Sequence, residues 1–475
     1  MRLLLTHFTF TRDDRDIAQA TTLLERLLQE SRPDIAGAVF ALAAIPPRRS
    51  MSNMRVDLPF SRKTIALDVP DNATVLYPNP TQAIAGVPAA TLEALRAPIA
   101  GPPLRDRVRP GQKVAIVVSD LTRPVPNPLL LPPVFAELKA AGVAEDDIYI
   151  INGTGLHREN TPEELEEMLG AEIARRYRIV QHVARDRSTV VEVGRSKGVV
   201  AELCRAYVEA DVRIVTGFVE PHLFAGYSGG PKGVMPGVAG ADIVMSNHGA
   251  PNLAHPKARW GVTRGNPVWD EIDAIVAMCP PHFLLNVTLD SARGVTGVFA
   301  GDMTPSHEAA IAQARAQYLL PVRHPYDVVV VTNMGYPADT TFYQAVKGLS
   351  VAAEGVREGG AILLVAGCEE GIGSHDYIHG LQAAATPAAL LERILHTEEP
   401  RHDQWQVQCQ AMVQIKADVH VYSMMSPEQS RTAHVTHVTD PQDTLYALIA
   451  TARAAGRDGS VLVLPHAQMT VPVVE

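Results

Sequence analysis

Short apolar runs that alternate with helical patterns constrain the fold of this chain more than any other feature. Continuous apolar segments, typical of strands buried on both faces, occupy residues 113–120, 147–153 and 212–219. A second series begins with the segments at residues 326–333 and 359–367. Strands that are separated by helices favour parallel pairing, because the helix carries the chain back across the sheet. The sequence therefore predicts an α/β fold with mostly parallel strands.

The two series are separated by a polar, proline-containing stretch near residues 321–325. A chain of 475 residues also exceeds the size at which one hydrophobic core keeps growing, so two domains are the default expectation. We therefore predict an N-terminal α/β sheet domain over residues 51–322 and a C-terminal α/β sheet domain over residues 323–475.

Helical patterns follow several of the strands. One of them has well-defined ends, because Thr161 can cap the helix, Glu164 stands at the capping-box position and Gly170 can end it. Helices are expected at residues 133–141, 161–170, 203–207 and 339–356.

Residues 1–50 differ from the remainder of the chain. They lack the apolar core of about 7–15 residues that a signal peptide has, and their acidic residues argue against a transit peptide. Residues 17–30 could form an amphipathic helix, and Met51 or Met54 would serve as a natural start. We interpret residues 1–50 as an upstream extension or a mis-called start, with a genuine accessory helix as the alternative.

The composition argues against several classes of protein. A formal net charge of −10 disfavours non-specific nucleic-acid binding, which needs a basic surface. The four cysteines form no CxxC pair, which fits a reducing compartment and offers neither a zinc site nor a disulfide scaffold. No apolar run reaches the roughly 18–20 residues that a membrane span requires. We expect a cytoplasmic protein that binds neither nucleic acid nor a membrane.

A glycine-rich stretch over residues 216–249 carries three groups suited to chemistry. His222 follows the apolar strand, Lys232 lies in the run GGPK, and His248 ends a short helical pattern. Glycines let successive backbone N–H groups approach a ligand such as a phosphate. The run is no Walker motif, because Gly233 replaces the Ser or Thr that would hold magnesium. Each residue alone could be an ordinary polar side chain, but three in one loop after a buried strand favour a site.

Polar residues also follow two other expected strands. Asp120 and Arg123 lie three residues apart in a proline-braced turn, and a guanidinium suits a carboxylate or a phosphate. A structural ion pair that fixes the loop would explain them equally well. His157 lies in the run GTGLHR, which lacks the third glycine of a dinucleotide-binding motif. On the helix expected at 339–356, Gln344 and Lys347 share a face that could look across a cleft or be ordinary solvated surface.

Five separated motifs, taken together, closely resemble the nickel-pincer lactate racemase family: DLTRPVPN, GTGLHRE, EPHLFAGYSGGPKGVMPG, SNHG and YQAVKG. The resemblance extends from about Met51 to the C-terminus. It implies a larger N-terminal and a smaller C-terminal α/β domain with the active site in the cleft between them. It also implies a nicotinate-derived mononucleotide with two sulfur groups, attached to a lysine through a thioamide, whose nickel is held by two sulfurs, a ring carbon and a histidine.

The resemblance implies roles for individual residues. Lys232 is similar to the attachment lysine, His248 to the nickel ligand, and His157 with His222 to the acid/base pair that moves the substrate hydroxyl proton. Trp405 could be the counterpart of a substrate-side tryptophan. Arg123 and Lys347 are similar to a pair that clamps the substrate carboxylate, with Asp120 orienting and Gln344 assisting. The nucleotide phosphate would contact Thr122, Gly229, Gly230 and Gly233.

The activity that the resemblance implies is racemisation of a small 2-hydroxy acid, most simply lactate, with proteins that make the cofactor as partners. A soft metal bound by sulfur and one imidazole suits nickel. Since the α-proton beside a carboxylate is too weak an acid for histidine, we expect hydride transfer to the cofactor, with the hydroxyl proton moving separately. One alternative is a racemase or epimerase of another acid, which could be malate, a short-chain or aromatic 2-hydroxy acid, or a sugar acid. Two further alternatives are an NAD-dependent 2-hydroxy acid dehydrogenase and a non-catalytic nucleotide- or metal-binding protein. A zinc hydrolase is disfavoured, because His222 and His248 lack the spacing of HExxH.

Overall fold

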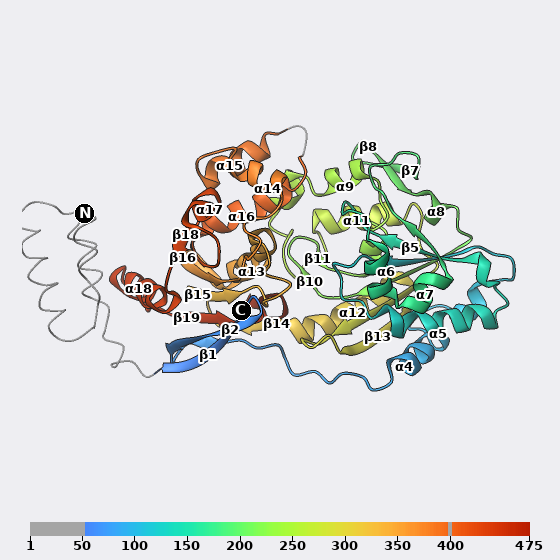
Figure 1. Cartoon of the computed structure of the whole chain (residues 1–475), viewed down its shortest axis with the longest axis horizontal. Helices are drawn as coiled ribbons and strands as arrows, with labels where there is room; N and C mark the ends of the chain where they lie inside the picture. Colours follow the sequence, from blue (N-terminus) through green and yellow to red (C-terminus); the bar gives the residue numbers. More distant parts are fainter. Residues whose placement is uncertain (1–52, 398–400) are drawn as a thin grey trace, which may run out of the picture.

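The structure is a computed structural model that describes residues 53–397 and 401–475. The chain forms two lobes, each built on a six-stranded sheet, and Figure 1 shows them side by side. The predicted α/β fold class is confirmed by the strands and helices of both lobes. The predicted extension at residues 1–50, with the helix expected at 17–30, lies outside the described residues.

The sheet of the first lobe is parallel except for one edge strand. In spatial order its strands are β13 (Val295–Gly301), β12 (Phe283–Leu289), β9 (Val212–Phe218), β4 (Val114–Ser119), β5 (Ile148–Gly153) and β6 (Arg178–Gln181). Only the pair β12 and β13 is antiparallel. Chain order reverses between β4 and β9, and open α/β sheets bind ligands at the carboxyl ends of strands beside such a reversal.

The sheet of the second lobe is parallel throughout. In spatial order its strands are β18 (Thr436–Val438), β17 (Ala417–Tyr422), β16 (Val356–Val365), β15 (Tyr326–Thr332), β19 (Val461–Leu464) and β3 (Thr74–Val75). Its chain order reverses between β15 and β19.

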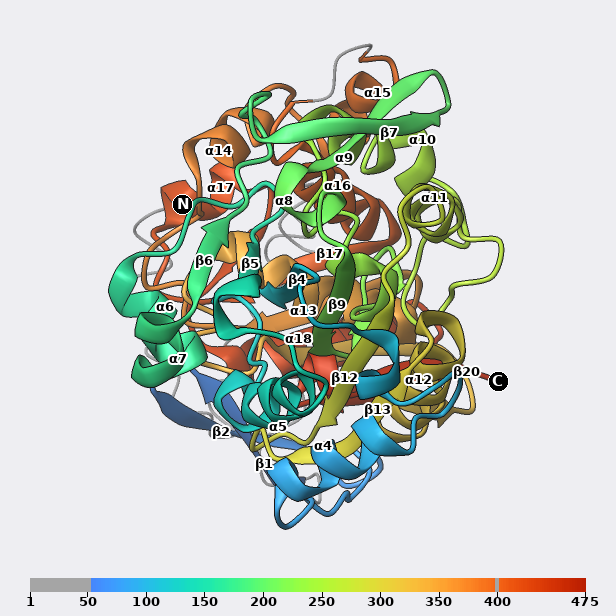
Figure 2. The same cartoon turned by 90° about the vertical axis from the view of Figure 1, so that its right-hand side faces the viewer.

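Both faces of each sheet are covered, which explains the continuous apolar runs in the sequence. In the first lobe α4 (Val87–Arg96) and α5 (Asn127–Ala140) pack on one face, while α9 (Ala241–Asn247) and α11 (Pro267–Val276) pack on the other (Figure 2). Successive residues of a strand point to opposite faces, so Ile116 joins the first core and Val117 the second.

In the second lobe α13 (Phe342–Gly355) and α16 (Gln404–Lys416) cover one face of the sheet. The other face is covered by α18 (Pro441–Ala454) and by a hairpin of β1 (Asn53–Phe60) and β2 (Lys63–Pro70). The remaining α-helices of the described residues are α6 (Pro162–Leu169), α7 (Ala171–Arg176), α8 (Arg205–Val208), α10 (Ala250–Leu253), α12 (Met303–Tyr318), α14 (His375–Leu381), α15 (Pro387–Leu395) and α17 (Pro427–Thr432).

The first part of the described chain belongs with the second lobe. The prediction placed it in the N-terminal domain of residues 51–322, but Val56 and Leu58 of the hairpin are buried against Val328 and Val330 of the second sheet. The edge strand β3 hydrogen-bonds to β19 of the same sheet. Near the predicted boundary, β14 (Leu319–Val322) pairs with β20 (Val471–Val474) at the end of the described chain.

Two of the expected helices differ from the structure. The helix expected at 133–141 begins at Asn127, since its internal prolines do not break it. Leu203 lies in the strand β8 (Val199–Cys204), which pairs with β7 (Val190–Ser196), and only the short helix α8 (Arg205–Val208) follows. The capping box of Thr161 and Glu164 at α6 is confirmed. Within the described ranges, no helix is long and apolar enough to cross a membrane.

Candidate active site

The glycine-rich segment folds over the carboxyl edge of the first sheet. After β9 it forms the short hairpin of β10 (Pro221–His222) and β11 (Gly226–Tyr227), then a 3₁₀ turn over Gly230–Gly233 that contains Lys232, and then α9. The edge at which the chain order reverses is therefore the place where His222, Lys232 and His248 come together, as an open α/β sheet favours.

Two buried polar side chains brace the turn before Lys232. Asn286 of β12 accepts a hydrogen bond of 2.7 Å from the backbone N–H of Gly230, and His307 of α12 donates from Nε2 to the carbonyl of Ser228 at 2.9 Å. Burial lowers the pKa of His307 to about 4, so the ring is neutral at neutral pH. Neither residue was identified from the sequence, because their role depends on contacts with distant parts of the chain.

The glycines of this turn have a packing reason. Gly229 and Gly230 have φ of 71° and 52°, a backbone region that suits glycine. A Cβ on Gly230 would lie 2.5 Å from the ring of His307, and a Cβ on Gly233 would lie 2.5 Å from Cγ1 of Val215 on β9. These positions require glycine whatever ligand the loop binds.

The ring of Phe224 joins three of the predicted residues. His222 and His248 meet it edge-on, with ring centroids 4.7 Å and 4.9 Å away, and Nζ of Lys232 lies 5.7 Å from its centroid. Such contacts fix an imidazole or an ammonium against an apolar surface. Phe224 lies inside the motif EPHLFAGY, yet its role was missed, because an aromatic residue carries no obvious chemical signature in a sequence.

The imidazole of His248 is held between the lobes. Trp405 of α16 meets it edge-on with a centroid distance of 5.8 Å, on the other side of the cleft from the first sheet. Burial and the charge of Lys232 lower the pKa of His248 to about 3. Its Nδ1 is buried and makes no hydrogen bond with the described residues. A neutral imidazole with a buried, unbonded nitrogen can serve as a metal ligand.

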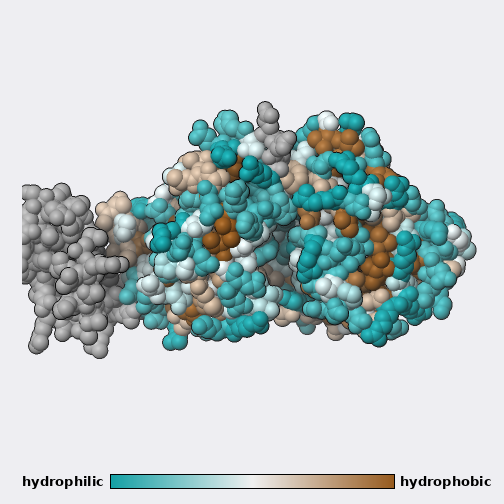
Figure 3. Space-filling model, turned by 45° about the horizontal axis from the view of Figure 1, so that its top comes forward, coloured by the Kyte–Doolittle hydropathy of each residue, from teal (hydrophilic) through white to brown (hydrophobic). Residues whose placement is uncertain are grey.

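Cations from both lobes meet in the cleft around Glu220, an acid that was not identified from the sequence. Burial and the charge of Arg123 lower the pKa of Lys232 to about 7 and that of Lys347 to about 8. Burial raises the pKa of Glu220, although Arg123, Lys347 and Lys232 oppose that shift. Arg123 and Lys347 therefore lie within electrostatic reach of each other across the lobes. Figure 3 shows that the surface is hollowed between the two lobes.

The turn after β4 connects its acid to the histidine that follows β5. Asp120 is buried and pairs with Nδ1 of His157 at 2.7 Å, while its other oxygen accepts a bond of 2.6 Å from the Thr122 hydroxyl. Burial raises the pKa of Asp120, but the bonds from His157 and Thr122 and the charge of Arg123 outweigh it, so the pKa lies below its usual value. A carboxylate on Nδ1 holds the proton there and leaves Nε2 of His157 with its lone pair.

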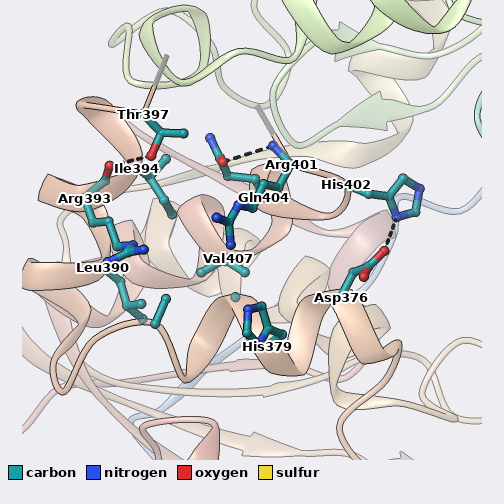
Figure 4. A pocket seen from close by; sticks show the side chains of 12 residues that line it. Asp376, His379, Leu390, Arg393, Ile394, Thr397, Arg401, His402, Gln404 and Val407 are labelled. Carbon is teal, nitrogen blue, oxygen red and sulfur yellow. Dashed lines mark hydrogen bonds and ion pairs between the residues drawn. The ribbon is translucent and has the colours of Figure 1, made fainter. Parts of the chain in front are cut away.

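On the second lobe, Gln344 and Lys347 lie on the first half of α13, and both side chains are half-buried. The helix is capped by Thr341, whose hydroxyl accepts a bond from the N–H of Gln344. A further pocket lies among α14, α15 and α16 (Figure 4). It contains none of the predicted catalytic residues, and its link to the cleft is His402, whose ring contacts Trp405.

The fold and the facing side chains define a two-lobed α/β enzyme with cations and neutral imidazoles gathered between its lobes. Comparison with known proteins identifies the family. The family model for the lactate racemase N-terminal domain matches residues 60–261, and the model for the lactate racemase C-terminal domain matches residues 322–472. The chain belongs to the lactate racemase family and is an isomerase of the racemase type.

Individual relatives agree with this assignment. The lactate racemase of Lactiplantibacillus plantarum is 32% identical over 80% of this chain and 91% of its own length, and that of Thermoanaerobacterium thermosaccharolyticum is 29% identical over 77% and 87%. The structure of the latter's apoprotein is similar with a TM-score of 0.82 at 27% identity, covering 88% of this chain and all of that chain. A Thermotoga maritima protein shares the fold, with a TM-score of 0.59 at 18% identity over 82% of this chain and 97% of its own.

Proposed function

We propose that this protein racemises lactate with a nickel-containing pincer mononucleotide attached to Lys232. The observation that carries the proposal is the arrangement at Phe224, where an amine and a buried imidazole with an unbonded nitrogen contact one ring. An attachment point and a metal ligand have to lie this close to act on one bound group. The similarity to two lactate racemases supports lactate as the substrate.

The residues present fit such a cofactor. The amine of Lys232, with a pKa of about 7, is about half unprotonated at neutral pH, and the unprotonated form can form a covalent link. His248 would hold the nickel through an imidazole that is neutral at the same pH. Thr122 and the loop of Gly229, Gly230 and Gly233 remain the proposed contacts of the nucleotide phosphate. When bound, the cofactor would supply the hydride chemistry at the substrate α-carbon.

Two histidines would handle the hydroxyl proton. Asp120 orients His157 so that Nε2 can accept a proton. Burial and the charge of Lys232 keep the pKa of His222 well below its usual value, so this ring is also neutral. Its Nδ1 accepts weak bonds from the N–H groups of Phe224 and Ala225, which leaves Nε2 for the substrate. One histidine near each face of the substrate would serve each enantiomer.

Arg123 and Lys347 would bind the substrate carboxylate from opposite lobes, with Gln344 assisting. Both cations influence the pKa of the same acid, Glu220, so they face a common volume. A carboxylate held by two cations leaves the α-carbon free to turn when the intermediate 2-oxo acid exposes its other face. The same clamp would accept other 2-hydroxy acids, because it contacts only the carboxylate that they share.

A panel of 2-hydroxy acids tests the proposed activity. The protein is produced together with a cofactor-making pathway, and each pure enantiomer of lactate, malate, a short-chain, an aromatic and a sugar-acid substrate is followed by chiral chromatography. We expect the fastest approach to a racemic mixture with lactate and no requirement for added NAD. Release of NADH would favour a dehydrogenase, and racemisation of another acid alone would replace lactate as the substrate.

A further inference from the structure

A buried amide from the second sheet contacts the turn of α13 that carries Lys347. Asn333 follows β15 directly and is fully buried. Its Nδ2 donates to the carbonyl of Gln344 at 3.1 Å, and its Oδ1 accepts from the N–H of Gly348 at 3.1 Å. In an α-helix the N–H of residue i+4 and the carbonyl of residue i pair with each other. The side chain of Asn333 therefore spans one such pair, and Lys347 lies within the turn that the pair encloses.

The amide of Asn333 is itself held in place. Its Nδ2 also donates to the carbonyl of Ala338, and its Oδ1 also accepts a bond of 3.1 Å from Nε2 of Gln468. The helix lies very close to the strand at this point, because a Cβ on Gly348 would come within 2.7 Å of the carbonyl of Thr332. With its donors and acceptor engaged and no room to move, the amide is a rigid contact between strand and helix.

The same turn is held from the first lobe. The hydroxyl of Ser350 donates to the carbonyl of Lys347 at 2.8 Å, and Nε1 of Trp260 donates to that hydroxyl at 3.2 Å. Trp260 belongs to the first lobe and is buried against the second. The backbone of Lys347 is thus fixed on one side by its own sheet and on the other side by the opposite lobe.

We propose that Asn333 is a positioning residue for the reaction, which sets the place of the Lys347 ammonium by fixing its helical turn to β15. The inference rests on the proposed function, in which Lys347 binds the substrate carboxylate. A cation on a long side chain binds a carboxylate well only when its backbone is fixed, and a displacement of about 1 Å can cost up to a hundredfold in rate. Asn333 is fully buried and so out of reach of a ligand in the cleft, which means that it acts through Lys347.

A double-mutant cycle tests this role in the cofactor-loaded enzyme. We expect Asn333→Ala to lower kcat/KM for lactate by about 10- to 100-fold, mainly through KM. In the Lys347→Ala background the same substitution should change KM by less than about twofold, because the group that it positions is gone. Gln410→Ala is the matched control, since Gln410 is a buried amide of the same lobe that bonds a backbone carbonyl elsewhere. It should lower the melting temperature and leave KM unchanged.

A second variant and a binding measurement keep the test decisive if Asn333→Ala folds poorly. Asn333→Asp keeps the acceptor for Gly348 but sets a carboxylate oxygen against the carbonyls of Gln344 and Ala338, so its KM should rise at least as much as that of Asn333→Ala. Calorimetry with oxamate, an unreactive carboxylate of similar size, should give the same order of Kd values. If Asn333→Ala raises KM equally with and without Lys347, the positioning role of Asn333 is wrong, while the proposed function still stands. An unchanged KM in Lys347→Ala would instead show that Lys347 does not bind the substrate carboxylate, which contradicts that part of the proposed function.

Discussion

Both lobes are built on mostly parallel sheets within which the chain order reverses, yet they use the carboxyl edge of the sheet differently. In the first lobe this edge carries Asp120, Glu220 and the loop of Lys232, and the charges of Glu220 and Arg123 act on Lys347 of the second lobe. In the second lobe the corresponding edge is filled by the chain itself. The turn of the β1–β2 hairpin inserts there, and one carboxylate oxygen of Asp339 accepts bonds from the N–H of Ser61 at 2.8 Å and of Gly367 at 2.7 Å.

The difference shows how one architecture can serve two purposes. The first sheet presents chemical groups on loops, which buried side chains such as Asn286 and His307 make rigid. The second sheet presents a helix, and its own edge is used to fix that helix through Asn333. Changes in the first lobe should therefore abolish cofactor attachment or turnover, whereas changes in the second lobe should weaken substrate binding.

The largest effect is expected at Lys232. Lys232→Ala should remove the covalent mononucleotide and all activity, because the attachment amine is lost. Intact-mass measurement checks the adduct, and Lys139→Ala, which changes an exposed lysine of the same lobe, should keep both the adduct and the activity. A fully active protein without an adduct would contradict the proposal that the first lobe holds the cofactor through Lys232.

A smaller loss is expected at the histidine that is paired with Asp120. His157→Ala should lower kcat by about 10²- to 10⁴-fold, the usual contribution of a general acid or base, while the adduct on Lys232 is retained. Asp120→Asn should lower kcat by less, because the amide keeps the contact but not the charge that orients the ring. Loss of the adduct in either variant would show that these residues support the cofactor rather than proton transfer.

The pH dependence of KM should identify the cation of the second lobe. The pKa of Lys347 is about 8, so below pH 8 the ammonium that binds a carboxylate prevails. As pH rises through 8, the charge is lost, and KM should rise by up to about tenfold per pH unit. In Lys347→Arg the guanidinium stays charged, so this rise should disappear. A rise that persists in Lys347→Arg would assign the titration to another group.

The smallest effect on activity is expected for Asn286 and His307, which brace the turn before Lys232 in the first lobe. Their substitution should affect stability instead. The pKa of His307 is about 4 in the folded protein and about 6.5 when unfolded, so the unfolded state takes up the proton first. The free energy of unfolding should therefore fall as pH drops from 6.5 to 4, by about 3 kcal/mol from this residue. Chemical denaturation at several pH values measures it, and His307→Phe should flatten the curve.

The sequence predicted those parts of the protein that depend on local pattern. The alternation of apolar runs and helices predicted both sheets. The glycine-rich motif predicted His222, Lys232 and His248, which contact the ring of Phe224, and two other motifs predicted Asp120 and His157, which pair with each other. It could not predict contacts between distant segments. Val56 lies in a hairpin whose pattern does not tell which sheet it covers. Asn286 is a single amide within an apolar strand and Asn333 directly follows another, and only the fold reveals what they hold.

In the proposed reaction the histidines move only the hydroxyl proton, and the α-hydrogen leaves as a hydride, for which the bound cofactor would supply the acceptor. Lactate carrying deuterium at C2 is incubated with the loaded enzyme in ordinary water until it is racemic, and both enantiomers are analysed by mass spectrometry. We expect the label to be largely kept in both enantiomers, with traces of the 2-oxo acid after quenching. Complete washout of deuterium would contradict the proposed reaction, because a base that exchanges its proton with solvent would then be removing the α-hydrogen.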